Sequence, residues 1–245
     1  MISNDLIFDI GLHRGLDAQY YLNKGFRVIG LEAVPALVAE CRKKLHSHGG
    51  RLVIVNKALY HEAGKTVTFY TVPGKDDWGS LNQQVAEKAV EKATPITVET
   101  VDLTWLFDRF GVPRYIKCDI EGADIIFREQ LIRETRRPTF VSIEVNDGHE
   151  GAALAECGYE VAQIVNQWFH PFRQPPNPAR EGKFVAAQFT GETSGLFGLE
   201  LPATSWQPID EIDAITRRWK ELRAIDEQLA PGWLDVHAAT RAALV

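Results

Sequence analysis

Two stretches far apart in the chain constrain its fold more than any other feature. Each runs as an apolar segment, reaches an acid and turns through a glycine: Phe8–Gly15 (FDIGLHRG) and Tyr115–Gly122 (YIKCDIEG). Such turns are typical of doubly wound α/β sheets, whose ligands bind beyond the carboxyl ends of the strands. The pair therefore predicts an α/β protein with a ligand site between the two turns.

Strand and helix patterns alternate on both sides of these turns. Strands are predicted at Leu6–Ile10, Phe26–Leu31, Leu52–Val55, Thr66–Val72, Ile96–Val101, Tyr115–Cys118, Phe140–Val145 and Tyr159–Val165. Helices are predicted at Asp17–Lys24, Pro35–His46, Val85–Ala93, Leu103–Phe110, Ala123–Glu134 and Ala152–Cys157, and the stretch Gly74–Gln84 is turn-rich. The rhythm predicts a mostly parallel central sheet with right-handed crossovers and a helical layer on each face.

Domain organisation follows from the same rhythm. The alternating elements lie within residues 1–205, and the helical pattern of Asp210–Leu229 lies beyond the last expected strand. We expect one domain over residues 1–205 with residues 206–245 as its C-terminal helical extension.

Composition excludes several classes of partner. The formal net charge is −6, which argues against a general affinity for nucleic acid or anionic membranes. No apolar run is long enough to span a bilayer. The three cysteines form neither a CxxC pair nor an even-numbered framework, which indicates reduced thiols. We expect a cytoplasmic protein, while the sequence leaves its oligomeric state open.

The first glycine turn departs from the dinucleotide-binding fingerprint. That fingerprint needs G-x-G-x-x-G, so that the backbone can approach a pyrophosphate, whereas Gly11 and Gly15 enclose no further glycine. A nucleoside ligand without a pyrophosphate, such as S-adenosylmethionine, does not need that approach. Glu32 ends the second strand, where an acid can bind both ribose hydroxyls. The alternatives are a turn acid at Asp9 and a solvated acid at Glu32.

The second turn carries an unusual cation. Lys117 lies in an expected central strand, where a lysine is costly unless it is paired. We expect a carboxylate partner among Asp9, Asp119 and Glu144. Together with Glu121, the acids at these strand ends form a polar cluster of the kind in which pKa values shift.

These motifs, with Gly30–Pro35, Asn56-Lys57-Ala58 and Val98–Asp102, resemble the FkbM family of methyltransferases from about Leu6 to Val145. The resemblance implies the class I, Rossmann-like methyltransferase fold, a three-layer sandwich. It also implies S-adenosylmethionine as cofactor and O-methylation of a sugar or natural-product hydroxyl. By that likeness Asp9, Gly11, Gly15 and Glu32 hold the cofactor, Asp119 lies near its methyl group, and the acceptor is a small molecule or glycan. From the residues themselves we add His13, Ala33, Asn56, Ala58 and Asp119 to the expected cofactor-binding residues, and we expect Asp119, Glu121 and Lys117 to be catalytic.

Several alternatives remain beside the resemblance. His13-Arg14 departs from the family, which more often has Asn and a small residue there, and Asn56 could equally be a turn residue. Asp119 is our first choice of general base, followed by Glu121 or His149. Trp78 or Trp168 could stack on the acceptor, although both suit a hydrophobic lid.

The rival functions belong to other classes. An NAD-linked oxidoreductase or epimerase is disfavoured by the absent middle glycine and by the lack of a Tyr-x-x-x-Lys pair. A cofactor-binding module without activity is the rival outside enzymes. We predict no metal site, although Asp119, Glu144 and His149 could together hold a divalent ion.

Overall fold

The computed structural model describes residues 2–87 and 92–244, with the side chains of residues 75–78 excepted. Its main sheet has eight strands in the order β11-β10-β12-β9-β8-β1-β2-β3. Their bounds are β1 Ile2–Ile10, β2 Arg27–Leu31, β3 Leu52–Val55, β8 Val112–Cys118, β9 Phe140–Glu144, β10 Val161–Asn166, β11 Gln207–Pro208 and β12 Leu234–Ala239. Strands β1, β2, β3, β8 and β9 are parallel, while β12 runs antiparallel to both of its neighbours. The mostly parallel sheet is therefore confirmed.

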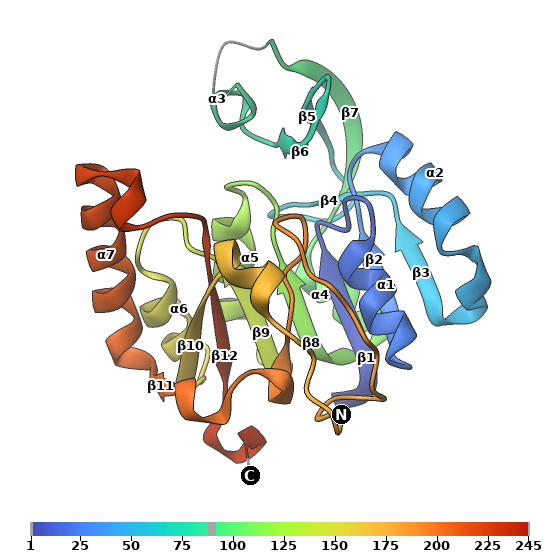
Figure 1. Ribbon diagram of the computed structural model, residues 1–245. Coiled ribbons are helices and arrows are strands. Elements are labelled where there is room, and N and C mark those ends of the chain that lie inside the picture. Colours follow the sequence, from blue (N-terminus) through green and yellow to red (C-terminus); the bar gives the residue numbers. More distant parts are fainter. Residues whose placement is uncertain (1, 88–91, 245) are drawn as a thin grey trace.

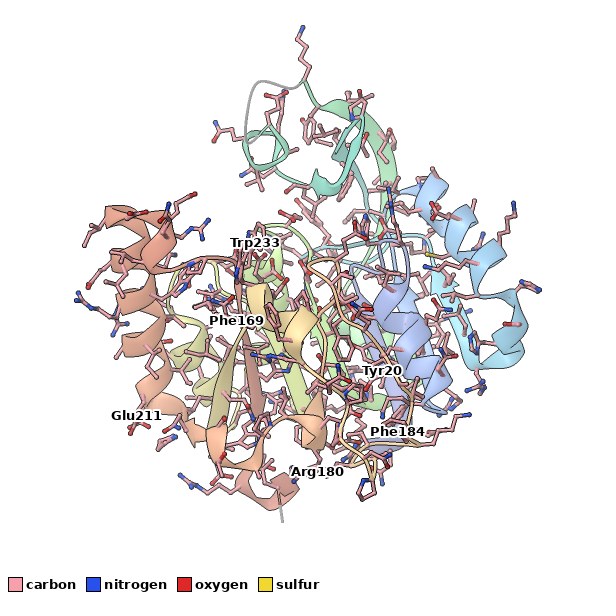
Figure 2. All side chains as sticks on the ribbon, in the orientation of Figure 1. Tyr20, Phe169, Arg180, Phe184, Glu211 and Trp233 are labelled. Carbon is pink, nitrogen blue, oxygen red and sulfur yellow. The ribbon has the colours of Figure 1, made fainter. Side chains whose placement is uncertain are left out.

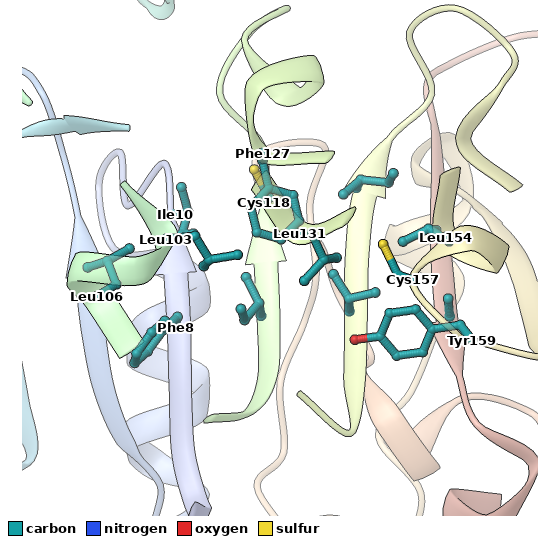
Figure 3. Packing of buried hydrophobic residues seen from close by; sticks show 14 of the residues in the cluster. Phe8, Ile10, Leu103, Leu106, Cys118, Phe127, Leu131, Leu154, Cys157 and Tyr159 are labelled. Carbon is teal, nitrogen blue, oxygen red and sulfur yellow. The ribbon is translucent and has the colours of Figure 1, made fainter. Parts of the chain in front are cut away.

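Helices cover both faces of this sheet (Figure 1). They are α1 Leu16–Asn23, α2 Pro35–Lys44, α4 Leu103–Phe110, α5 Asp124–Arg133, α6 Glu150–Glu156 and α7 Ile209–Ile225. Successive side chains of a strand point to opposite faces, and β1 shows this directly. Ile7 packs in one core cluster with side chains of α1 and α2. Tyr20 of α1, labelled in Figure 2, belongs to this cluster. Phe8 and Ile10 pack in the other cluster, with α4, α5 and α6 (Figure 3).

A second, smaller sheet stands above the carboxyl edge of the main one (Figure 1). Its order is β4-β7-β5-β6, with β4 Ala58–Leu59, β5 Thr66–Val72, β6 Lys75–Ser80 and β7 Thr94–Val101, and α3 spans Gln83–Ala86. The strand expected at Thr66–Val72 is confirmed, but the stretch expected to be turn-rich contains β6. The helix expected over Val85–Ala93 meets only the end of α3, and its residues 88–91 lie outside the described part of the chain.

The C-terminal segment corrects one expectation. Helix α7 confirms the helical pattern of Asp210–Leu229, but residues 206–245 also supply β11 and β12 to the main sheet. All six residues of β12 are buried between β9 and β10. Asp235 and His237 interrupt the apolar run expected of a buried strand, so the sequence pattern did not predict β12. The extension is therefore part of the core and is not purely helical.

Candidate functional site

A cavity of about 230 Å³ lies between the carboxyl edge of the main sheet and the small sheet. The main sheet contributes Gly11, His13, Leu31, Glu32, Ala33, Lys117, Asp119, Ile120, Glu121 and Glu144 to its lining, and the small sheet and its approach contribute Lys57, Ala58, Leu59, Phe69, Gly79 and Leu81. Strands β1 and β8 are neighbours, and the strand order reverses between them. The cavity therefore occupies the topological switch point, where doubly wound folds bind ligands.

The two glycine turns touch one another at this point. The amide of Asp119 donates to the carbonyl of Ile10 at 3.1 Å. Gly11 has a φ of +84°, and a Cβ on it would lie 1.9 Å from the carbonyl oxygen of Asp119. The sequence predicts a ligand site between the two turns, and at Gly11 and Asp119 the turns contact each other directly. A glycine is needed here because the second turn, rather than a ligand, fills the space beside it.

Glu32 is held by the backbone of the cavity's own loops. Its Oε2 accepts from the amide of His13 at 2.7 Å, and its Oε1 accepts from the amide of Val34 at 2.9 Å. Burial raises the pKa of this carboxyl, and the two amides oppose the shift. Only 7% of Glu32 is exposed, so it is not a solvated acid. Each carboxylate oxygen keeps a second lone pair for a ligand hydroxyl.

Three residues predicted to touch the cofactor lie behind the lining instead. The Asn56 side chain donates to the carbonyls of Glu32 and Ala33 at 2.9 and 3.0 Å, so it fixes that turn. Gly15 adopts a φ of +67° at the start of α1, facing Leu45. Asp9 is fully buried under the loop. None of the three lines the cavity; each lies behind residues that do.

Lys117 has the carboxylate partners that its burial requires. Its Nζ donates to the carbonyl of Gly11 at 3.0 Å and lies 3.5 Å from Asp9, 3.7 Å from Asp119 and 4.0 Å from Asp17. Burial alone lowers the pKa of the ammonium, but these carboxylates raise it well above its usual value. Lys117 is thus a fixed positive charge beneath both turns. Among the described residues, Glu144 is not one of its ion-pair partners.

The opposite side of the cavity is acidic. Asp119, Glu121 and Glu144 line it, and Glu121 has a φ of +51°, unusual for a residue with a side chain. The carbonyl of Glu121 accepts from Ser80 Oγ at 2.9 Å, which ties this turn to the small sheet. Burial raises the pKa of Glu144 well above its usual value, and the neighbouring acids, with Asp119 foremost, raise it further.

Asp235 lies directly opposite Glu144 in the β9–β12 pairing. It is 3% exposed, and its Oδ1 accepts from Gln167 Nε2 at 2.9 Å. No described residue donates to its Oδ2. Burial raises the pKa of this carboxyl well above its usual value. Two carboxyl groups thus meet at the ends of β9 and β12, and only one of their four oxygens accepts a hydrogen bond from a described side chain.

Phe69 and Trp233 line the cavity although the sequence did not point to them, and Gln167 lines it beside Trp233. The amide of Gln167 donates to the carbonyl of Trp233 at 2.9 Å, so the two enter the cavity together. Trp168 is outside the lining, and the side chain of Trp78 lies outside the described part of the structure. The sequence alone did not show that Trp233, and not Trp168, lines the cavity.

His149 does not join the acid cluster. Its side chain is exposed, its amide donates to Asp147, and it is absent from the lining. In the part of the chain that the structure describes, no three His, Cys, Asp or Glu side chains are grouped so as to hold a metal ion. None of the described helices is both long and apolar enough to cross a membrane.

The lining suits S-adenosylmethionine. Glu32 offers acceptors for ribose hydroxyls, and Ala33, Leu37 and Leu59 give apolar walls for an adenine ring. The carboxylates across the cavity suit the positive charge of a sulfonium. A pyrophosphate would instead require a glycine two residues after Gly11, where the backbone can approach it, and His13 occupies that position.

Solved structures align with nearly the whole chain at low identity. A precorrin-6y C5,15-methyltransferase from Geobacter metallireducens has 12% identity, 98% coverage of this chain, 82% coverage of its own and a TM-score of 0.42. A second is an S-adenosylmethionine-dependent methyltransferase from Geobacter sulfurreducens in complex with S-adenosyl-L-homocysteine. It has 13% identity, 98% coverage of this chain, 86% coverage of its own and a TM-score of 0.38. A third methyltransferase, from Archaeoglobus fulgidus, has 10% identity, 97% coverage of this chain, 87% coverage of its own and a TM-score of 0.40. No curated protein matches the sequence.

A family model matches most of the chain. Residues 9–170 match the methyltransferase FkbM domain, a range that includes both glycine turns, Glu32 and Glu144. The sheet order and the helices on both faces are those of the class I methyltransferase fold. The cofactor of this family is S-adenosylmethionine. With most of its length matched, including the cavity's two glycine turns, the chain belongs to the FkbM family of methyltransferases.

Proposed function

We propose that this protein transfers the methyl group of S-adenosylmethionine to a hydroxyl of a sugar or natural product. One observation carries the proposal. A single cavity joins Glu32 and the first glycine turn to Asp119, Glu121 and Glu144. One side offers the contacts that a nucleoside needs, and the other offers carboxylates that can orient a hydroxyl and accept its proton.

The chain's main contribution to methyl transfer is alignment. When bound, the cofactor supplies an electrophilic methyl on a sulfonium. Glu32 would hold the ribose, and the loop from Gly11 to His13 would fix the amino-acid end. In-line displacement gains most from this positioning, because holding reactants in a near-attack geometry removes much of the entropic barrier.

The acceptor hydroxyl must also lose its proton as its oxygen bonds to the methyl carbon and the carbon–sulfur bond breaks. Asp119 lies beside a buried cation, since Lys117 Nζ is 3.7 Å from its carboxylate. Glu144 lines the same cavity without such a cation, and burial raises its pKa. We therefore assign the proton to Glu144, with Asp119 and Glu121 orienting the hydroxyl.

Two measurements test this function. Calorimetry should show binding of S-adenosylhomocysteine and none of NAD; the reverse result would support the oxidoreductase rival. Release of S-adenosylhomocysteine from S-adenosylmethionine should then depend on an added hydroxyl acceptor from a panel of sugars and hydroxylated natural products. Cofactor binding without acceptor-dependent release across the panel would support the inactive binding module.

A further inference from the structure

A second cavity lies on the far side of Trp233. It has a volume of about 380 Å³ and is lined by Val145, Trp219, Lys220, Arg223, Ala224, Gly232 and Trp233; we call it the α7 groove. Trp233 also lines the first cavity, and Figure 2 shows it at the upper edge of the main sheet. The two cavities therefore share Trp233 as a wall.

The two cavities have opposite charge character. The first is lined by five acids, Glu32, Asp119, Glu121, Glu144 and Glu192. The lining of the α7 groove contains no acid and includes both Lys220 and Arg223. This contrast occurs in a chain of net charge −6, so general composition does not explain it.

The positive charges of the α7 groove are only partly compensated. Lys220 Nζ donates to the carbonyl of Asn146, and Arg223 Nη1 donates to the carbonyls of Ala230 and Gly232 at 3.1 and 2.8 Å. Carbonyls fix these groups in place without neutralising them. The Glu227 carboxylate is 3.4 Å from Arg223, but its side chain is 80% exposed, and solvent weakens such a pair.

The α7 groove also holds a hydrogen-bond donor and an aromatic surface. The indole Nε1 of Trp219 is buried, and no described residue accepts its hydrogen bond. A buried donor without a partner destabilises the structure, and a ligand oxygen would relieve that cost. Trp233 is 53% exposed, which leaves ring surface on which a sugar or aromatic ring can stack.

We propose that the α7 groove is the acceptor subsite for an oxyanion, and that the acceptor is an anionic glycoside. Its ring stacks on Trp233, and its carboxylate or phosphate lies near Lys220, Arg223 and the indole N–H of Trp219. The hydroxyl to be methylated lies across Trp233, beside Glu144. This inference rests on the proposed function, because it extends the acceptor side of the same site.

Three matched probes test the subsite. They are 4-nitrophenyl β-glucoside, its 6-phosphate and 4-nitrophenyl β-glucuronide, which share an aglycone and differ in charge. Binding is followed at low salt by quenching of tryptophan fluorescence. We expect at least one anionic probe to bind about tenfold more tightly than the neutral glucoside, with the advantage falling at high salt because exposed charges are screened. The stronger of the two anionic probes identifies the oxyanion.

Substitutions test whether the preference for anionic probes comes from the α7 groove or from general surface charge. Lys220→Met should remove most of the anionic preference, and Trp233→Ala should weaken all three probes. Arg218→Met is the matched control, since Arg218 lies on the same helix, pairs with Glu221 and is outside the lining. Three results would overturn the subsite. They are equal binding of the neutral and anionic probes, no binding of any probe, and a loss of anionic preference in Arg218→Met equal to that in Lys220→Met. Calorimetry with S-adenosylhomocysteine on the same proteins distinguishes this result from failure of the proposed function, which loss of cofactor binding would indicate.

Discussion

Glu32 and Glu144 lie on opposite sides of one cavity, and both are carboxyls whose pKa burial raises. The groups that surround the two carboxylates differ. Glu32 accepts two backbone amides at 2.7 and 2.9 Å, whereas no described residue donates a hydrogen bond to the Glu144 carboxylate and it faces Asp235 across the strand pair. In the proposed function, the carboxylate that binds the cofactor is thus fixed by the fold. The carboxylate that would accept the proton has open lone pairs and a raised pKa, at a cost in stability.

The largest effect should follow loss of the acceptor-side carboxylate. Glu144→Gln keeps the shape and hydrogen-bonding capacity but removes the proton acceptor. Because general-base catalysis contributes about 10²–10⁴-fold, turnover should fall by that factor while affinity for S-adenosylhomocysteine is unchanged. Steady-state kinetics with calorimetry on the same protein measures both. Asp119→Asn is the comparison variant, and a larger loss of turnover there than in Glu144→Gln would return the base to Asp119.

The charge between the two sides should matter for stability. Lys117→Met leaves the buried carboxylates of Asp9 and Asp17 without their cation. Removing one partner of a buried ion pair costs about 3–5 kcal/mol, so the urea midpoint should fall strongly. Lys65→Met is the control, because Lys65 pairs with Glu62 at the surface, where such pairs contribute about 0–1 kcal/mol. Similar losses in the two variants would show that Lys117 is not the charge that holds the turns together.

The cofactor side should respond mainly in binding. Glu32→Ala removes acceptors for the ribose and leaves the amides of His13 and Val34 unpaired. The affinity for S-adenosylhomocysteine should fall by about 1–3 kcal/mol, the range for leaving buried polar groups unsatisfied. Turnover at saturating cofactor should change much less than in Glu144→Gln. A folded variant with wild-type affinity would remove Glu32 from the binding site.

The pH profile sharpens the comparison further. The base must be ionised to act, and burial together with Asp119, Asp124, Glu121 and Asp235 raises the pKa of Glu144 above its usual value. Activity should therefore rise with pH through an elevated pKa, and fall about tenfold for each unit below it. An ordinary carboxylate base would already be ionised and give a flat profile from pH 6 to 8. Glu144→Gln should abolish the rising limb.

Much of the main sheet was predictable because its strands are short apolar runs that end in polar turns. The main-sheet strand at Leu52–Val55 and the helix at Leu103–Phe110 have the bounds expected from the sequence, and so does Thr66–Val72 in the small sheet. Two of the strands that were not expected have a clear physical reason. β12 contains Asp235 and His237, which hide a buried strand, and β6 lies in a stretch rich in turn-forming residues.

The site was less predictable than the fold. The sequence placed Glu32, Asp119 and Lys117 correctly at the cavity, because strand ends of a parallel sheet meet at one edge. It did not distinguish residues that line the cavity from residues that hold those in place. Asn56 and Gly15 support the first turn from behind, and Trp233 enters from a loop beyond the matched domain. Those distinctions depend on tertiary contacts that no local pattern encodes.

The most direct measurement is a crystal structure with S-adenosylhomocysteine bound. The ribose hydroxyls should lie within hydrogen-bonding distance of the Glu32 carboxylate, and the sulfur should face Asp119 and Glu144 across the cavity. A nucleoside bound with its ribose away from Glu32, or a sulfur directed away from the acidic side, would contradict the division of the cavity into a binding side and a reactive side.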